Sequence, residues 1–154
     1  MTSPQVWEDA FARAQYVGQQ LGQAVFDPLQ QNRDIQQDKP YWIVETSSGL
    51  AEPMEIGQGQ NMDSLQIDQE TGQIWLHLMV PKGSASTAKA LPWRKAMSNA
   101  FRRNGDPPGK WADGLYYDTQ QASPPDLDQE GNWYVLGLAI NYRYQDGYAG
   151  QQSP

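Results

Sequence analysis

The sequence contains no cysteine, and this absence excludes several kinds of site at once. Without thiols there can be no disulfide, no thiolate zinc site, no iron–sulfur cluster and no cysteine nucleophile. The chain also has a single histidine, His77, among its 154 residues. Histidine is the commonest metal ligand and the usual base near neutral pH. We therefore expect no metal site and no cofactor.

Basic residues are scarce as well. The 11 Lys and Arg residues stand against 18 Asp and Glu residues, which gives a net charge of −7. Binding to duplex DNA depends on a basic surface that displaces counterions, so we expect no tight nucleic-acid binding. No apolar run approaches the length of a membrane span, and no basic segment followed by an apolar one marks a signal peptide. These absences predict a soluble protein without a membrane contact.

Hydrophobic residues make up 38% of the chain and include six tryptophans, which is enough for a substantial core. No internal repeat and no linker divides the sequence. We expect a single domain over residues 1–154, with a mobile C-terminal tail from about residue 147.

The first expected element is an amphipathic helix. Ser3 and Pro4 suit the N-cap and the first helical position, and Asp27-Pro28 is expected to end the helix. Arg13 falls among the polar positions of this pattern. The apolar positions recur every three or four residues, at Trp7, Ala10, Phe11, Ala14, Val17, Leu21 and Val25.

A second helix is expected to begin at Ser84, Ser86 or Thr87 and to end near Arg103, before Asn104-Gly105. Pro92 lacks the amide donor of a helix interior, so the helix either kinks there or starts near Trp93. Its apolar stripe consists of Ala90, Trp93, Met97, Ala100 and Phe101.

Strands are expected at residues 41–46, 65–68, 73–80, 115–119 and 133–144. Residues 69–72 are expected to form the turn of a hairpin, and residues 47–61 a long exposed loop. The last strand would span about 40 Å, so it projects beyond the core. One of its faces is apolar and aromatic, formed by Tyr134, Leu136, Leu138, Ile140, Tyr142 and Tyr144.

The predicted fold class is α+β, a mainly antiparallel sheet backed by two helices in the order α-β-β-β-α-β-β. The strand at residues 73–80 is apolar on both faces, since Trp75, His77 and Met79 lie opposite Ile74, Leu76, Leu78 and Val80. We expect the helices to cover one face and a neighbouring subunit the other.

Possible chemistry is limited. His77 lies in an apolar strand, and the sequence places no orienting acid or nucleophile beside it, so we expect no enzymatic activity. Asp63, Asp68 and Glu70 gather around the expected hairpin turn. They lack the spacing of a calcium loop, which favours a solvated acidic turn over a cation site.

Surface residues offer better candidates, and they concern partner contacts. Trp111, next to Lys110, lies in a loop where no periodic element buries it, so an anchor for a partner and packing on its own domain are equally open. We expect the loops at residues 49–61, with Glu55 and Ile56, and at residues 104–114 to contact neighbouring proteins instead of the subunit's own core. The second helix carries a basic face formed by Arg94, Lys95, Arg102 and Arg103. Such a face is usually solvated, but in a ring it could pair with acidic residues of the next subunit.

The order of these elements resembles the phage tail terminator, or tail-completion, family of ring-forming head–tail joining proteins. The resemblance extends from about Val6 to Tyr144. Three segments carry it: Pro40–Val44, the apolar strand that enters Pro81–Gly83 before a helix reaching Phe101, and Trp133–Val135 leading to Ile140–Tyr142.

The resemblance implies a structural protein of the virion, made in the host cytoplasm, that forms a hexameric ring on the tail tube and joins it to the neck. Its partners would be its own copies, the tail tube protein, the neck or connector protein and, where a tail has one, the sheath protein. A ring of acidic subunits predicts Asp63, Asp68 and Glu70 facing the channel. Two alternatives stay open: another head–tail connector such as a stopper, and a small bacterial binding module.

Overall fold

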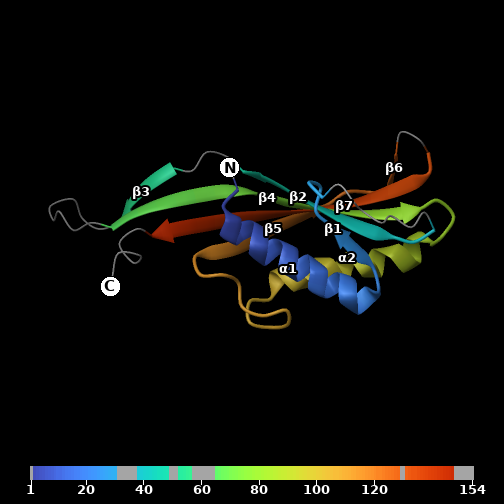
Figure 1. Cartoon of the computed structure of the whole chain (residues 1–154), viewed down its shortest axis with the longest axis horizontal. Coiled ribbons are helices and arrows are strands. Elements are labelled where there is room, and N and C mark those ends of the chain that lie inside the picture. Colours follow the sequence, from blue (N-terminus) through green and yellow to red (C-terminus); the bar gives the residue numbers. More distant parts are fainter. Residues whose placement is uncertain (1, 31–37, 49–51, 57–64, 129–130, 148–154) are drawn as a thin grey trace.

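The computed structural model describes residues 2–30, 38–48, 52–56, 65–128 and 131–147. Within these ranges, two helices and seven strands form an α+β fold, and the predicted mainly antiparallel sheet backed by two helices is confirmed. Both helices lie on the same side of the sheet (Figure 1). The elements are α1 (Pro4–Leu21), β1 (Ala24–Phe26), β2 (Tyr41–Ser48), β3 (Glu52–Ile56), β4 (Leu65–Pro81), α2 (Thr87–Arg102), β5 (Leu115–Ala122), β6 (Asp126–Leu127) and β7 (Trp133–Gly147).

The sheet runs in the order β1-β2-β4-β7-β5, with β3 beside β4 and β6 beside β7. Of the strand pairs in the described ranges, the short β1–β2 pair is parallel and the others are antiparallel. Strands β4 and β7 form the centre of the sheet and pair without a break from Ile67↔Gly147 to Pro81↔Trp133. Among the described residues, neither helix combines the length and the apolar character needed to cross a membrane.

Helix α1 begins at Pro4 as expected but ends at Leu21, earlier than predicted. Gly22 adopts a left-handed conformation with a φ of 70°, and the amide of Gln23 donates to the Gly18 carbonyl, which closes the helix. Val25 therefore belongs to β1 and not to the helix. The Ser3 hydroxyl makes no cap hydrogen bond, because it donates to Glu70 on β4 at 2.6 Å.

Helix α2 begins at Thr87, and the Ser86 hydroxyl caps it by accepting from the Lys89 amide. The helix runs through Pro92 to Arg102, so the alternative start near Trp93 is wrong. Pro92 is exposed and lies near the start of the helix, where the missing amide removes one hydrogen bond to the carbonyl four residues earlier.

Strand β4 contains the largest error of the sequence prediction. Residues 69–72 form no turn: the chain continues as one strand of 17 residues. The hairpin instead joins β4 to β3, which lies inside the segment predicted as a long loop. Gly72 sits in the strand interior because a side chain there would overlap β2, since a Cβ would lie 2.3 Å from the Ser47 carbonyl oxygen.

The core lies between the sheet and the two helices, as the apolar pattern predicts. All four apolar even positions of β4 and most of those of β7 are buried there, together with Trp42 and Val44 of β2. Tyr134 is the exception on β7, because it remains 36% exposed near the end of the sheet. The helices contribute Val6, Ala10, Ala14, Val17, Ala90, Met97, Ala100 and Phe101.

Figure 1 shows that β3 and the adjoining ends of β4 and β7 lie beyond the end of the helices. The predicted projection of the last strand is therefore present, and a second and a third strand accompany it. The predicted C-terminal tail falls almost wholly outside the described residues, which end at Gly147.

Candidate functional site

The sheet face that points away from the helices is the first candidate surface, called the open sheet face below. Its apolar part consists of Tyr41 and Ile43 of β2, Trp75, His77 and Met79 of β4, and Trp133 and Val135 of β7. The described part of the chain places no helix on it (Figure 1). Most of these side chains remain partly accessible, which is uncommon for a contiguous set of aromatic and aliphatic residues.

Aromatic contacts hold the open sheet face in one arrangement. Trp133 meets Tyr41 edge-to-face, with ring centroids 5.1 Å apart, and Trp75 stacks on His77 at 6.3 Å. Rings fixed in this way lose little conformational freedom when a partner covers them. The face is therefore suited to a contact with another protein.

His77 lies on the open sheet face as predicted, and its Nε2 is 3.1 Å from a carboxylate oxygen of Glu45. Glu45 occupies the neighbouring strand, and its side chain is 54% exposed. No nucleophile joins this pair in the contacts that the described residues make. The geometry is that of a surface hydrogen bond between neighbouring strands.

A groove between α2 and β5 is the second candidate surface, called the α2–β5 groove below. Leu91, Ala122 and Leu138 give it an apolar part, and α2 contributes three cationic side chains to its lining. Among the described residues, no ion pair joins Lys89, Arg94, Lys95 or Arg102 to a carboxylate. The lining residues are Leu91, Arg94, Lys95, Ser98, Arg102, Gln120, Ala122 and Leu138.

Two arginines of this groove are fixed by neutral partners. Arg94 donates to the backbone carbonyls of Ser123 and Gly137, and partial burial lowers the pKa of its guanidinium. Arg102 donates through Nε to the Ser98 hydroxyl at 3.0 Å, and Gln120 lies within reach of both. Both guanidinium groups are thus positioned without being neutralised. Arg103, outside the groove, lies 3.8 Å from Asp106.

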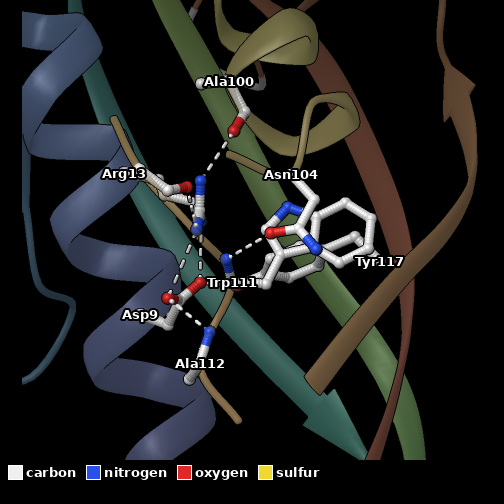
Figure 2. Close-up of polar contacts among 8 residues, drawn as sticks. Asp9, Arg13, Ala100, Asn104, Trp111, Ala112 and Tyr117 are labelled. Atoms are coloured by element: carbon white, nitrogen blue, oxygen red, sulfur yellow. Dashed lines mark hydrogen bonds and ion pairs between the residues drawn. The ribbon is translucent and has the colours of Figure 1, made fainter. Parts of the chain in front are cut away.

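A buried polar network joins α1 to the loop after α2 (Figure 2). The Arg13 Nε donates to Asp9 at 2.7 Å, and its terminal nitrogens donate to the carbonyls of Ala100 and Gly109. Asp9 also accepts from the Tyr117 hydroxyl at 2.6 Å and from the Ala112 amide at 3.2 Å. Arg13 is only 3% exposed. The network fixes the loop, and its charges are fully paired.

Trp111 packs on its own domain. Its ring meets Tyr117 edge-to-face at 5.5 Å, and its amide donates to the Asn104 side chain at 2.8 Å. The loop at residues 104–114 was expected to avoid the subunit's own core, and this expectation is wrong because the Arg13 network holds it there. The indole nitrogen is buried without a hydrogen-bond partner. Lys110, beside it, is exposed.

Glu70 does not belong to an exposed acidic turn. It is 4% exposed and lies on the helix side of β4, where it accepts from the Ser3 amide, the Ser3 hydroxyl and the Tyr142 hydroxyl. Its predicted place on a channel wall is wrong, because the start of α1 covers it. Burial, with the Glu70 contact next, raises the pKa of Tyr142.

Of the remaining predicted positions, Glu55, Ile56 and Asp68 lie at the projecting end of the sheet. Asp63 falls outside the described residues. Asp68 belongs to β4, and Glu55 and Ile56 belong to β3, for which the structure gives the backbone position alone. Most of the predicted loop at residues 49–61 also lies outside the described residues. Its partner contacts stay a prediction.

The arrangement of the described residues offers binding surfaces, and its least exposed charged groups, Asp9, Arg13 and Glu70, all have hydrogen-bond partners. No cluster of three or more His, Asp or Glu in that part of the chain could hold a metal ion. Sequence reasoning missed Asp9, Arg13 and Tyr117 as a unit. The spacing of Asp9 and Arg13, four residues apart on a helix, is the signal that points to an ion pair.

Burial raises the pKa of Tyr117 above its usual value of 10.0, and the adjacent Asp9 carboxylate adds to the effect. The unfolded chain therefore releases this proton before the folded chain does, so the stabilisation is complete below pH 10 and is lost as the pH rises further. We expect this residue to contribute a fall of about 1.4 kcal/mol per pH unit in the free energy of unfolding.

Urea unfolding between about pH 9 and about pH 11 checks this prediction. Tyr117→Phe should show a shallower decline than the native chain, and Tyr116→Phe, at an exposed position, should follow the native chain. Parallel curves for the native chain and Tyr117→Phe would contradict the assignment.

No family model matches the chain, and no curated protein matches it. Among solved structures, the chain is similar to one chain of the virion of a native gene transfer agent particle. The two share 12% identity with a TM-score of 0.49, over 94% of this chain and 96% of that chain. A likeness of this degree does not define a function, which has to follow from the residues themselves.

Proposed function

We propose that the chain is a non-enzymatic structural protein of a phage-like virion, a tail terminator that forms a ring on the tail tube and joins it to the neck. The observation that carries this proposal is the open sheet face. Both helices cover one side of the sheet, and the other side keeps Trp75, Met79 and Trp133 partly accessible. A surface of this kind is typical of a subunit that works in an assembly.

The resemblance of three sequence segments to tail terminators is the reason for proposing this assembly in particular. The segments correspond to the start of β2, the passage from β4 into α2, and the first half of β7. These elements form the sheet centre and its connection to the helices, so the resemblance concerns the framework of the fold. The proposed partners are other copies of the chain in a hexamer, the tail tube protein and the neck protein.

The open sheet face would serve one of these contacts. A partner that covers Trp75 removes its aromatic surface from water, and aromatic residues at the centre of an interface commonly contribute about 2 kcal/mol or more. Trp75→Ser is therefore expected to weaken assembly about 30-fold or more. Because the side chain is partly exposed in the subunit, folding should be affected far less than assembly.

Sedimentation velocity and native mass measurement test the proposal on the protein alone and with its tail tube protein. The native chain should form a ring in one of the two conditions, and Trp75→Ser should reduce it. His77→Gln, on the same strand and the same face, should weaken assembly much less than Trp75→Ser does, because an amide can still donate to Glu45. Reconstruction of the particle gives the decisive outcome: a chain located away from the tail end contradicts the proposed function.

A further inference from the structure

The charges of this chain are unevenly divided along the sequence. Residues 71–105 contain six Lys and Arg and no Asp or Glu, whereas the rest contains five Lys and Arg and all 18 acidic residues. The two parts carry +6 and −13, which together make the net charge of −7. Residues 71–105 therefore form a basic segment in an acidic chain.

The basic part is concentrated on α2, above the α2–β5 groove. Lys95 and Arg102 are exposed, and Arg94 is held by backbone carbonyls without a counter-ion among the described residues. Leu91, 39% exposed, and Leu138 give the groove an apolar part. A groove that combines cationic and apolar lining residues suits an acidic segment that also carries hydrophobic residues.

The acidic part includes the projecting end of the sheet, called the acidic arm below and made of residues 52–56, 65–69 and 144–147. It contains Glu52, Glu55, Asp68 and Asp146 and no Lys or Arg. Asp68 and Asp146 are register partners on β4 and β7. The arm thus carries four acidic residues and no basic one, so a cationic partner would complement its charge.

We infer that the acidic arm of one copy of this chain binds in the α2–β5 groove of the next copy. This inference rests on the proposed function and names the contact that closes the ring. The contact joins two different surfaces, so it repeats head to tail from one copy to the next. Each subunit in a closed ring then uses both surfaces.

The sheet topology is consistent with this head-to-tail contact. Strand β5 is the last strand on one side of the sheet, and β3 lies beside β4 on the other side, next to the end of β2. Two opposite edges of one sheet thus border the two surfaces of opposite charge. In Figure 1 the arm lies beyond the end of the helices, so one subunit presents it away from its own α2.

Complementary charge reversals test the contact on the full-length protein. Lys95→Glu/Arg102→Glu reverses the groove, and Glu52→Lys/Glu55→Lys/Asp68→Lys reverses the arm. Each variant alone should lose the ring in sedimentation velocity, because every contact then joins like charges. An equimolar mixture should restore it, since alternating copies pair a reversed groove with a reversed arm and a native groove with a native arm.

Two further variants separate this effect from changes in net charge and in folding. Lys39→Glu/Lys82→Glu makes the same change of charge at two exposed positions outside both surfaces and should assemble as the native chain does. Lys95→Gln/Arg102→Gln removes the charge without reversing it. This variant should weaken the ring and reduce the dependence of assembly on salt. Circular dichroism verifies that each variant is folded.

Four outcomes would overturn the inference. If the native chain and both reversed variants form rings equally, the contact lies elsewhere and the proposed function stands. If the folded variants do not recover in the mixture, the arm is not the partner. If the native chain stays monomeric at low salt both alone and with its tail tube protein, copies do not bind in this way, and the position of the chain in the particle then decides the proposed function separately. If the native chain binds duplex DNA and Lys95→Glu/Arg102→Glu does not, the groove serves a polyanion.

Discussion

Replacing Arg13 with methionine is expected to lower the free energy of unfolding by about 3–5 kcal/mol. Methionine keeps most of the volume, so the loss reports on charge and hydrogen bonds. Without Arg13, the Asp9 carboxylate, 13% exposed, stays beside Tyr117 with no cation, and the carbonyls of Ala100 and Gly109 lose a donor. A loss of this size is a large part of the stability of a typical domain.

Urea unfolding followed by tryptophan fluorescence measures the effect, and a second Arg–Asp pair of the chain provides the control. Arg143 donates to Asp118 at 2.9 Å, close to the 2.7 Å of the Arg13–Asp9 pair, but its side chain is 46% exposed. Arg143→Met should cost less than about 1 kcal/mol, because water screens and replaces an exposed ion pair. Equal losses of unfolding free energy for the two variants would show that burial does not make the Arg13–Asp9 pair more stabilising than the exposed pair.

The second large effect is expected at Gly72. An alanine there would place its Cβ 2.3 Å from the Ser47 carbonyl oxygen and 2.8 Å from the Tyr142 hydroxyl. The first of these atoms belongs to the backbone of β2, so the strands must move apart and the hydrogen bond of Tyr142 to Glu70 is disturbed. We expect Gly72→Ala to lower the free energy of unfolding by about 3 kcal/mol.

Gly137→Ala is the matched control, since Gly137 also lies inside a central strand. The nearest atom to its Cβ is the Ser123 hydroxyl at 2.7 Å, which belongs to a side chain that can rotate away. Gly137→Ala should lower the free energy of unfolding by about 1 kcal/mol, the value of one lost hydrogen bond. A Gly72→Ala protein as stable as Gly137→Ala would mean that β2 and β4 separate without difficulty at this point.

The regular elements could be predicted from the sequence because their patterns reflect burial. The apolar positions of α2 and the even positions of β7 have one face against the core, so the period of hydrophobic residues follows the geometry of the element. The start of α1 at Pro4 was also readable, and Ser86 was one of three candidate caps for α2, since the helix start has definite chemical requirements. The predicted cap by the Ser3 hydroxyl is wrong, because this hydroxyl donates to Glu70. Alternation on β4 correctly indicated the apolar open sheet face.

Positions whose role depends on distant contacts could not be read in the same way. Gly72 follows two polar residues and looks like a turn, whereas the close approach of β2 decides its conformation. Arg13 fits the polar side of α1, but the loop after α2 folds over it. Glu70 seemed solvated because its partners, Ser3 and Tyr142, are 67 and 72 residues away in the sequence.

The continuous pairing of β4 with β7 has a mechanical consequence. Fifteen register pairs join these two strands along nearly the whole sheet. A load that pulls the two strands lengthwise in opposite directions is shared by all the hydrogen bonds of this ladder at once, whereas a load at right angles to them opens the bonds one after another. The subunit should therefore be stiff along its long axis and yield more readily across it, so that a force applied at the projecting end is transmitted to the opposite end of the sheet.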